Sequence, residues 1–461
     1  MKIQLPEHVN QIIHRLQKEG YDAYAVGGCV RDTLLGRQPQ DWDITTSARP
    51  QVVKSLFCHT IDTGIQHGTV TVLVNRDILT AEDAGNVSHT DYAFEVTTYR
   101  VDGEYKDHRR PETVCFTASL EEDLKRRDFT INAMAYNPEQ GVIDIFGGQE
   151  DLKRGIIRCV GCACERFDED ALRILRAVRF GAQLDFAIED KIREATRNQA
   201  RFLKDISAER ICTELTKMLV SDHPERLEEA YELGLTKVFL PEFDVMMQTP
   251  QNNKHHSYSV GEHTLHTLTD VPADKVLRLT MLLHDVAKPA CISTDEKGQD
   301  HFYGHPEEGE RMARGILRRL KFDNDTTDRV CRLVRYHDER PMLSERNVRR
   351  LASRMGQEFV PDLMTVKRAD VLGQSMYRRE EKLAYVDRFE EIFEELEVQN
   401  QCMKKSDLAI NGRDLIEMGM HQGKELGAVL DYLFEQVLDE PELNTREKLL
   451  ELAHNVRTSL I

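Results

Sequence analysis

Two aspartates separated by one residue, Asp41 and Asp43, are the first side chains whose spacing predicts chemistry. On an extended strand, residues i and i+2 project to the same side, so the two carboxylates can share a divalent cation. Mg²⁺ suits carboxylate oxygens and substrate phosphates, and such an ion promotes phosphoryl transfer from a nucleotide. An isolated Asp-x-Asp is more often a solvated turn, by roughly ten to one. The interpretation therefore depends on the neighbouring residues.

A glycine turn before the aspartates and a polar run after them supply groups for a nucleotide. Gly28 lets backbone amides approach a triphosphate, and Arg31 can neutralise its charge. Further along, Arg127 suits phosphate and Asn132 suits ribose hydroxyls. Taken alone, that second run would be a helix start with surface charges. Together with the aspartates, these groups favour a nucleotide site.

Arginines recur at every third position after Asp170, as Arg173, Arg176 and Arg179. Helical spacing predicts that they share one face, with Asp170 one turn earlier on it. Asp170 can accept from the amino group of cytosine or adenine while Arg173 donates to the ring nitrogen. Uracil and guanine present the opposite pattern, and a mispaired buried polar group costs about 1–3 kcal/mol. The alternative is an exposed salt bridge worth about 0.2–0.5 kcal/mol.

A third group of residues combines histidine with aspartate. In chain order it contains His263, His284, Asp285, His305, His337 and Asp370. These are good ligands for transition metals and magnesium, and a metal with open positions can activate water against a phosphate ester. Lys288 lies one helical turn beyond His284 and could meet a phosphate. An isolated His-Asp pair is usually a polar helix end, but the ordered set is more specific.

The elements that must position these residues change type along the chain. Apolar periodicity predicts a helix over 6–19, and β-branched runs predict strands over 24–26, 42–46, 69–74 and 94–98. From about Gly148 strand signals nearly vanish and helical periodicity dominates. The polar segments 76–91 and 243–257 indicate an inserted loop and a linker.

Composition sets limits on the kind of protein. The chain has 461 residues, a net charge of −18 and ten cysteines. No apolar run approaches the roughly 18 residues that span a bilayer, and the start lacks a secretory signal, so we expect a cytoplasmic protein with no membrane partner and reduced thiols. The negative charge counts mildly against a nucleic-acid partner.

The first two groups of residues together resemble the bacterial-type (class II) branch of the poly(A) polymerase and CCA-adding enzyme family. The resemblance rests on three strings in order. They are Gly27-Gly28-x-x-Arg31-Asp32-x-Leu34-Leu35-Gly36, Asp41-Trp42-Asp43, and Arg126-Arg127-Asp128-Phe129-Thr130-Ile131-Asn132. The resemblance implies that Asp41 and Asp43 hold catalytic Mg²⁺, with Glu95 as a candidate third carboxylate.

The same resemblance assigns the arginine series a role in nucleotide choice. Glu169-Asp170-x-x-Arg173 resembles the family's amino-acid template for incoming CTP and ATP, with Arg176 and Arg179 near the nucleotide. The segment 102–111 is similar to the flexible loop that family members need to switch from C to A. Both features favour complete CCA addition over poly(A) synthesis.

The histidine-rich region resembles the HD superfamily. That resemblance makes His263, His284, Asp285 and Asp370 ligands of a divalent metal whose identity stays open, and His305 and His337 could complete a second site. HD domains fused to such transferases can hydrolyse 2′,3′-cyclic phosphates or phosphomonoesters, or can serve mainly to bind RNA. Both alternatives stay open.

The expected fold is an α/β nucleotidyltransferase head, with a small mixed sheet and helices, followed by a mostly α-helical neck, body, HD domain and tail. The expected domains are 1–147, 148–245, 255–375 and 376–461. The expected function is CCA addition to the tRNA 3′ end from CTP and ATP, with pyrophosphate released. The alternatives are an ATP-only poly(A) polymerase, or an HD phosphohydrolase or RNA-end binder with a vestigial head. Assembly into a homo-oligomer is left open.

Overall fold

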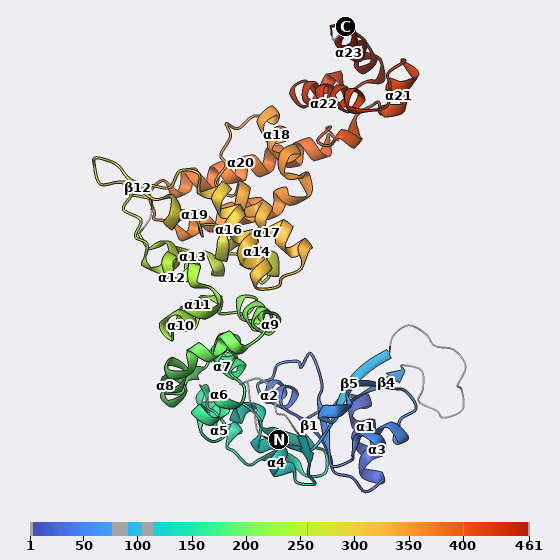
Figure 1. The fold of residues 1–461 in the computed structure, drawn as a ribbon, viewed down its shortest axis with the longest axis vertical. Helices are drawn as coiled ribbons and strands as arrows, with labels where there is room; N and C mark the ends of the chain where they lie inside the picture. The colour runs from blue at the N-terminus through green and yellow to red at the C-terminus, as the bar shows by residue number, and fades with distance from the viewer. Residues whose placement is uncertain (1–2, 76–90, 104–113, 256, 400, 460–461) are drawn as a thin grey trace. The chain divides into compact units, whose positions relative to one another are not determined.

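The computed structural model describes residues 3–75, 91–103, 114–255, 257–399 and 401–459. The chain divides into two compact units, Met1–Phe239 and Leu240–Ile461. The first carries the sheet, and the second is almost entirely helical (Figure 1). This is the expected fold class, a mixed-sheet head followed by a mostly helical body. Within the described residues, no helix is long and apolar enough to cross a membrane.

A seven-stranded sheet in the order β3-β4-β5-β2-β1-β8-β9 forms the centre of the first unit. Neighbouring strands are antiparallel except β2 and β5, which run parallel. The strands are β1 (Ala23–Val26), β2 (Ile44–Thr46), β3 (Thr60–Gly64), β4 (Thr69–Asn75), β5 (Asp91–Thr98), β8 (Met134–Asn137) and β9 (Gly141–Asp144). Short pairs also form between β6 (Arg100–Asp102) and β7 (Val114–Phe116), and between β10 (Ile156–Ile157) and β11 (Ala187–Ile188).

The helices of the first unit pack around this sheet and continue beyond it. They are α1 (Glu7–Lys18), α2 (Gly28–Leu34), α3 (Pro50–Leu56), α4 (Leu120–Lys125), α5 (Gly148–Arg154), α6 (Ala163–Glu169), α7 (Leu172–Leu184), α8 (Asp190–Gln199), α9 (Ala208–Leu219), α10 (Leu227–Glu232) and α11 (Thr236–Phe239). The prediction of the first helix is confirmed, because α1 buries Val9, Ile12, Ile13 and Leu16.

Three of the four predicted strands are confirmed within a few residues, as β1, β4 and β5. The fourth begins later than predicted, because β2 starts at Ile44 and the Asp41–Asp43 segment precedes it. Only the Asp43 carbonyl continues the pairing, by accepting from the Val26 amide at 3.0 Å. The two carboxylates therefore lie at the entrance to the strand and not within it.

The second unit consists of helices with one small hairpin. The helices are α12 (Pro241–Gln248), α13 (Val260–Thr269), α14 (Lys275–Leu283), α15 (Lys288–Cys291), α16 (His305–Arg319), α17 (Asn324–Tyr336), α18 (Glu345–Met355), α19 (Val360–Gly373), α20 (Arg379–Val398), α21 (Gly412–Glu417), α22 (Lys424–Asp439) and α23 (Arg446–Ser459). The hairpin pairs β12 (Ser293–Thr294) with β13 (Asp300–His301). The end of the chain has its own core, which includes Leu415, Leu433 and Leu449.

The predicted linker over 243–257 is wrong in its first half. Residues 241–248 form α12, and Phe243 and Met246 are buried. The segment is amphipathic, but Pro250 and the polar residues after it dominate its composition and hide the short helix before them. The predicted insertion lies mostly outside the described residues, at 76–90, as does much of the predicted flexible loop, at 104–113. The described ends of that loop pair as β6 and β7.

Candidate functional site

A cleft of about 620 Å³ in the first unit collects most of the predicted nucleotide-site residues. Its walls include residues from α2, the segment before β2, the run after α4, and helices α7 and α9. Those from the sequence prediction are Gly28, Arg31, Asp41, Asp43, Arg127, Asn132, Arg176 and Arg179. The structure thus brings together, on one cavity, residues that lie more than a hundred positions apart in the chain.

The turn between β1 and α2 forms the floor of this cleft. Gly27 has φ +83°, a left-handed conformation that favours glycine, and its amide donates to the Met134 carbonyl at 3.1 Å. A Cβ at Gly27 would lie 3.0 Å from Nη1 of Arg127, so the turn is also a point of close approach. The turn ends β1 and starts α2 at Gly28, which places the helix N-terminus beside the aspartates.

Asp41 and Asp43 both face the cleft and are accessible to solvent. Partial removal from water and the neighbouring Asp41 raise the pKa of Asp43, although Arg127 opposes this. The pKa of Glu95 is also raised, by desolvation and then by Asp43 and Asp41. Glu95 lies on β5 next to β2 but does not line the cleft. Each of these carboxylates disfavours negative charge on the others. A cation bound among them would stabilise their charged forms.

Asp41 and Asp43 do not by themselves form a closed metal cage. Among the described residues, the groups of three ligands with donor atoms within 4.8 Å of one another all lie in the second unit. Two carboxylates plus substrate phosphates are nevertheless what Mg²⁺ commonly uses, since it keeps several waters and rarely has an all-protein cage. The donor set of the first unit therefore fits Mg²⁺ bound together with a nucleotide.

A continuous hydrogen-bond network fixes the polar wall of the cleft. Arg31 donates to Asn132 Oδ1 at 2.7 Å and to both carboxylate oxygens of Asp32. Asn132 donates to Asp128 Oδ1 at 3.2 Å, and Arg176 donates to Asp128 Oδ2 at 2.8 Å. Burial raises the pKa of Asp128, but Arg176 and Arg173 outweigh it and hold that pKa well below its usual range.

Helix α9 contributes a buried partner that the sequence prediction missed. Glu214 accepts from Arg179 Nε at 2.7 Å and lies 3.6 Å from Arg176 Nη1. The Phe180 ring lies under Arg179 at 3.5 Å and also faces Arg31 at 5.0 Å and Arg176 at 5.3 Å. Glu214 lies at helical spacing from Ile211 and Met218 on the buried face of α9, and this position among apolar residues is the signal that could have identified it.

The predicted base-reading pair lies outside the cleft. Asp170 does not share the helical face of the arginines, because α7 begins only at Leu172 and Asp170 has φ −141°. Its oxygens accept from Arg210 at 3.2 and 2.7 Å. Arg173 is buried and donates to Glu169 Oε2 at 2.5 Å and to the Arg126 carbonyl at 2.9 Å. Only Arg176 and Arg179 of the series face the cleft.

The histidine and aspartate residues of the second unit converge as predicted. They form two groups that share Asp285: one with His263 and His284, the other with His305 and His337. Asp370 joins the first group through a 3.0 Å contact to His263 Nε2. All six residues are buried. They come from α13, the end of α14, the start of α16, the end of α17, and α19.

Each of the four histidines directs Nε2 into the cluster and holds Nδ1 against a backbone carbonyl. The carbonyls belong to Gly373, Met281, Phe302 and Val334, at 3.1, 2.7, 2.8 and 2.7 Å for His263, His284, His305 and His337. A carbonyl only accepts, so each Nδ1 carries a proton, and each Nε2 offers a lone pair to a metal when its ring is neutral. A hydrogen bond from the ring nitrogen that faces away from the metal, which fixes the orientation of the ring, is typical of metal-binding histidines.

The spacing of these Nε2 atoms fits a shared cation. Nε2 of His284 lies 3.3 Å from Nε2 of His263, and Nε2 of His305 lies 3.2 Å from Nε2 of His337. Burial lowers the pKa of His284, but Asp285 and Asp370 outweigh it and raise that pKa above its usual value. Two facing lone pairs are stabilised only by a cation or a shared proton, so the donor set fits divalent metal.

Lys288 contacts the cluster directly. Its Nζ lies 2.7 Å from Asp285 Oδ2 and 2.9 Å from Gln251 Oε1. The cluster opens onto a cavity of about 490 Å³ that Lys288 also lines. A ligand in that cavity would therefore reach Asp285, His305 and His337.

The fold and the first cleft define a nucleotidyltransferase of the poly(A) polymerase type. A family model described as "Poly A polymerase head domain" matches residues 23–158, and one described as "Probable RNA and SrmB- binding site of polymerase A" matches 185–247. A third, "tRNA nucleotidyltransferase domain 2 putative", matches 306–453.

Whole-chain comparisons narrow this class. The chain is 34% identical over 445 residues to the CCA-adding enzyme of Lactobacillus helveticus, covering 95% of each chain. It is 50% identical over 213 residues to that of Lactiplantibacillus plantarum, a match that covers 46% of this chain and 49% of that enzyme. A crystal structure of the Bacillus stearothermophilus CCA-adding enzyme in complex with CTP superposes with a TM-score of 0.70 at 31% identity, covering 97% of both chains. The chain belongs to the CCA-adding enzyme family of nucleotidyltransferases.

Proposed function

We propose that this chain adds CCA to the 3′ end of tRNA without a nucleic-acid template, using CTP and ATP and releasing pyrophosphate. The observation that carries the proposal is the cleft that joins Asp41 and Asp43 to the glycine turn and to Arg31, Arg127 and Arg176. The Bacillus stearothermophilus relative binds CTP. We extend that ligand to the corresponding cleft here.

The residues around the cleft divide the work of binding a nucleotide. Asp41 and Asp43 would hold Mg²⁺, which neutralises phosphate charge and favours attack by the tRNA 3′-hydroxyl on the α-phosphorus. The Gly28 amide at the helix N-terminus and the Arg31 and Arg127 guanidinium groups bind triphosphate oxygens. Asn132 is held by Arg31 and Asp128, so its orientation toward a ribose is fixed before the nucleotide arrives.

The proposed base reading by Asp170 and Arg173 requires a change of partners. Asp170 gives both oxygens to Arg210, and Arg173 gives its donors to Glu169 and two backbone carbonyls. A cytosine or adenine amino group would compete with Arg210 for Asp170, and its ring nitrogen would compete with Glu169 for Arg173. Only a base with that donor and acceptor pattern offers a new partner to both residues, whereas uracil or guanine would present an acceptor to Asp170 and a donor to Arg173.

Two variants test the assignment of the cleft. Asp43→Asn keeps the shape of the side chain but removes the charge that holds a cation, so incorporation of labelled CMP into a tRNA lacking CCA should fall by at least about 10²-fold. Glu95→Gln tests whether Glu95 is a third metal ligand. If Glu95 binds the metal, this variant should show a comparable loss of CMP incorporation. A folded Asp43→Asn variant with wild-type rates would contradict the proposal.

The second unit supports a second activity, metal-dependent hydrolysis of phosphate esters by an HD-type domain over 255–375. The observation that favours it is the convergence of four histidines and two carboxylates in a cluster whose members Asp285, His305, His337 and Asp370 line a cavity. A divalent metal there would supply an activated water. His263, His284, Asp285 and Asp370 would hold one ion, and Asp285, His305 and His337 a second.

Metal content and hydrolysis test this activity separately from CCA addition. The purified chain should bind Mn²⁺, and hydrolyse p-nitrophenyl phosphate or 2′,3′-cyclic AMP when loaded. Asp285→Asn removes the bridging charge and should abolish both. If the wild-type chain binds metal but hydrolyses neither compound, the hydrolase proposal is wrong.

A further inference from the structure

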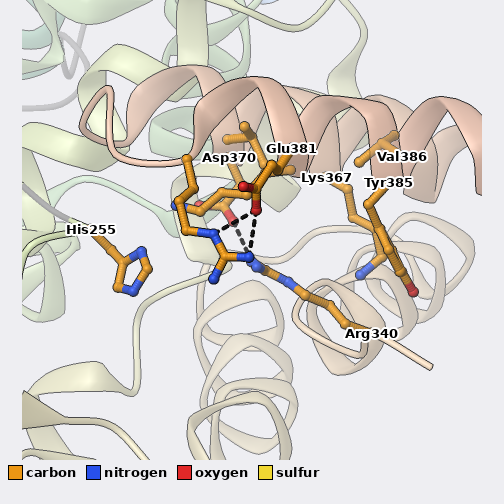
Figure 2. Close-up of a pocket in the computed structure, with 10 residues that line it drawn as sticks. His255, Arg340, Lys367, Asp370, Glu381, Tyr385 and Val386 are labelled. Carbon is orange, nitrogen blue, oxygen red and sulfur yellow. Dashed lines mark hydrogen bonds and ion pairs between the residues drawn. The ribbon is translucent and has the colours of Figure 1, made fainter. Parts of the chain in front are cut away.

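A second chamber of about 250 Å³ adjoins the cavity of the histidine cluster. The two cavities share four lining residues: His255, Arg340, Asp370 and Lys382. Asp370 therefore has the cluster on one side, through His263, and the chamber on the other, where Arg340 lies 3.9 Å away. Figure 2 shows Arg340 reaching toward Asp370 beneath α20, with His255 entering from a loop.

Five of the ten residues that line the chamber are basic, in a chain whose net charge is −18. They are His255, Arg340, Lys367, Arg378 and Lys382, and the carboxylates on its walls are Asp370 and Glu381. Asp370 faces the histidine cluster, and Glu381 accepts from Arg378 at 2.5 Å. Desolvation and then Arg340 lower the pKa of Lys382, and desolvation and then Lys382 lower that of His255. Burial and neighbouring positive charge both disfavour the charged forms of these two side chains, and an anion in the chamber would favour them.

The backbone at the chamber indicates a built site. Arg378 has φ +54° and ψ +29°, a left-handed conformation that is uncommon for a residue with a side chain. It is the N-cap of α20, a helix of 20 residues, so the first amides of that helix are close to the chamber. Strain that persists beside a cavity is a reason to look for a ligand there.

An aromatic pair lies on the larger cavity that contains the histidine cluster. The rings of His301 and Tyr303 stack at 5.4 Å with an interplanar angle of 7°, and Tyr303 is 78% exposed. Both line that cavity together with Asp285 and Lys382. Exposed aromatic faces bind nucleobases with little sequence preference.

We infer that the chamber is a subsite for a second phosphate, so that this cleft takes the end of an oligonucleotide strand. The terminal phosphate lies at the histidine cluster, the preceding phosphodiester lies among Arg340, Arg378 and Lys382, and a base stacks on Tyr303. This inference rests on the proposed phosphoesterase and specifies its substrate class. A nucleoside 3′,5′-bisphosphate offers the same two charges on one nucleoside and is the competing source.

Binding of non-hydrolysable ligands to the Mn²⁺-loaded full chain tests the inference. Three phosphonate analogues are compared by calorimetry: a ribonucleoside 3′-phosphate, a ribonucleoside 3′,5′-bisphosphate and a ribodinucleotide with a 3′-terminal phosphate. The dinucleotide should bind at least about tenfold more tightly than the single-phosphate ligand. Lys382→Ala and, as a separate variant, Arg378→Ala should reduce this ratio of the two affinities to about two. Arg388→Ala removes an exposed cation of the same helix outside the chamber and should leave the ratio unchanged.

Three outcomes overturn the inference or part of it. Equal affinity for the one-phosphate and two-phosphate ligands shows that the chamber is not a phosphate subsite, even if the chain hydrolyses phosphate esters. If the bisphosphate binds as tightly as the dinucleotide, the cleft binds small nucleotides. That result contradicts the inference that it binds the end of a strand. A ratio that Arg388→Ala reduces as much as Lys382→Ala shows a general charge effect. Tight dinucleotide binding without hydrolysis keeps the subsite and instead contradicts the phosphoesterase proposal.

Discussion

Individual arginines in the nucleotide cleft are held by buried acidic partners. Arg179 and Glu214 are both buried, and burial lowers the pKa of Arg179 to about 10 although Glu214 opposes this. A buried ion pair adds little net stability, but removal of one partner leaves a charge without compensation. The positions of the cleft arginines therefore depend on their acidic partners.

Glu214→Ala should lower the free energy of unfolding by about 3–5 kcal/mol, because Arg179 would be left buried beside Phe180. Urea unfolding followed by tryptophan fluorescence of Trp42, the only tryptophan, measures this in the first unit. Glu209→Ala changes an exposed glutamate on the same helix and should stay within about 0.5 kcal/mol of wild type. Equal effects of the two variants would show that the pair is not coupled.

Asp128 should make the first unit sensitive to acid. Its pKa in the folded protein lies below the usual value, so its charge stabilises the fold above the unfolded-state pKa of about 4. That contribution is lost as the pH falls from there through the folded-state pKa. Unfolding free energies of wild type and Asp128→Asn should differ most near neutral pH and converge below roughly pH 4. A difference in unfolding free energy that does not change with pH would show that Asp128 acts through packing and not through its charge.

Replacing Arg210 should change nucleotide choice more than stability. Arg210 occupies both oxygens of Asp170 and is only partly buried. Arg210→Ala removes this ion pair and leaves Asp170 accepting from the Leu172 amide, so discrimination between CTP and UTP, measured as the ratio of kcat/KM values, should change by roughly tenfold if Asp170 reads the base. An unchanged ratio would show that Asp170 does not read the base.

At the scale of elements, the turn between β1 and α2 sets the geometry of the cleft. Gly27 and Gly36 both have positive φ, but a Cβ at Gly27 would meet Arg127 whereas one at Gly36 meets nothing within 4 Å. Both alanine variants should lose roughly 1–2 kcal/mol of stability from backbone strain. Only Gly27→Ala should also reduce the rate of nucleotide addition, measured under saturating CTP. Equal rates for the two variants would show that the approach to Arg127 is not needed.

Elements with a clear local pattern are predictable from the sequence: helix α1 carries helical periodicity, and strands β1 and β4 carry aromatic or β-branched residues. Strand β1 is predicted although it is fully buried. Strand β8 is also fully buried over Met134–Asn137, but it contains no β-branched residue and its Ala and Asn are depleted in strands, so the sequence does not indicate it. The site shows the same limit: motifs located Asp43 and Arg176, whereas Arg210 acts through a contact that no local spacing encodes.

At the scale of the whole molecule, the two candidate sites belong to different compact units. Divalent metal that binds the histidine cluster should stabilise the second unit, by about 2.7 kcal/mol at a hundredfold excess over the dissociation constant. Thermal unfolding with Mn²⁺ and with a chelator measures this shift. Asp285→Asn should remove the shift and leave CMP incorporation intact. Loss of incorporation in that variant, with the protein folded, would contradict independent sites.

The most direct test of the central claim uses tRNA transcripts that end before CCA, after C and after CC. Each is incubated with the chain and one nucleotide at a time, then with all four. We predict two C additions followed by one A, with no U or G, and no product from Asp43→Asn. A long tail made from ATP alone would place the chain with the poly(A) polymerases. No incorporation by the folded wild-type chain would contradict the account of the first cleft.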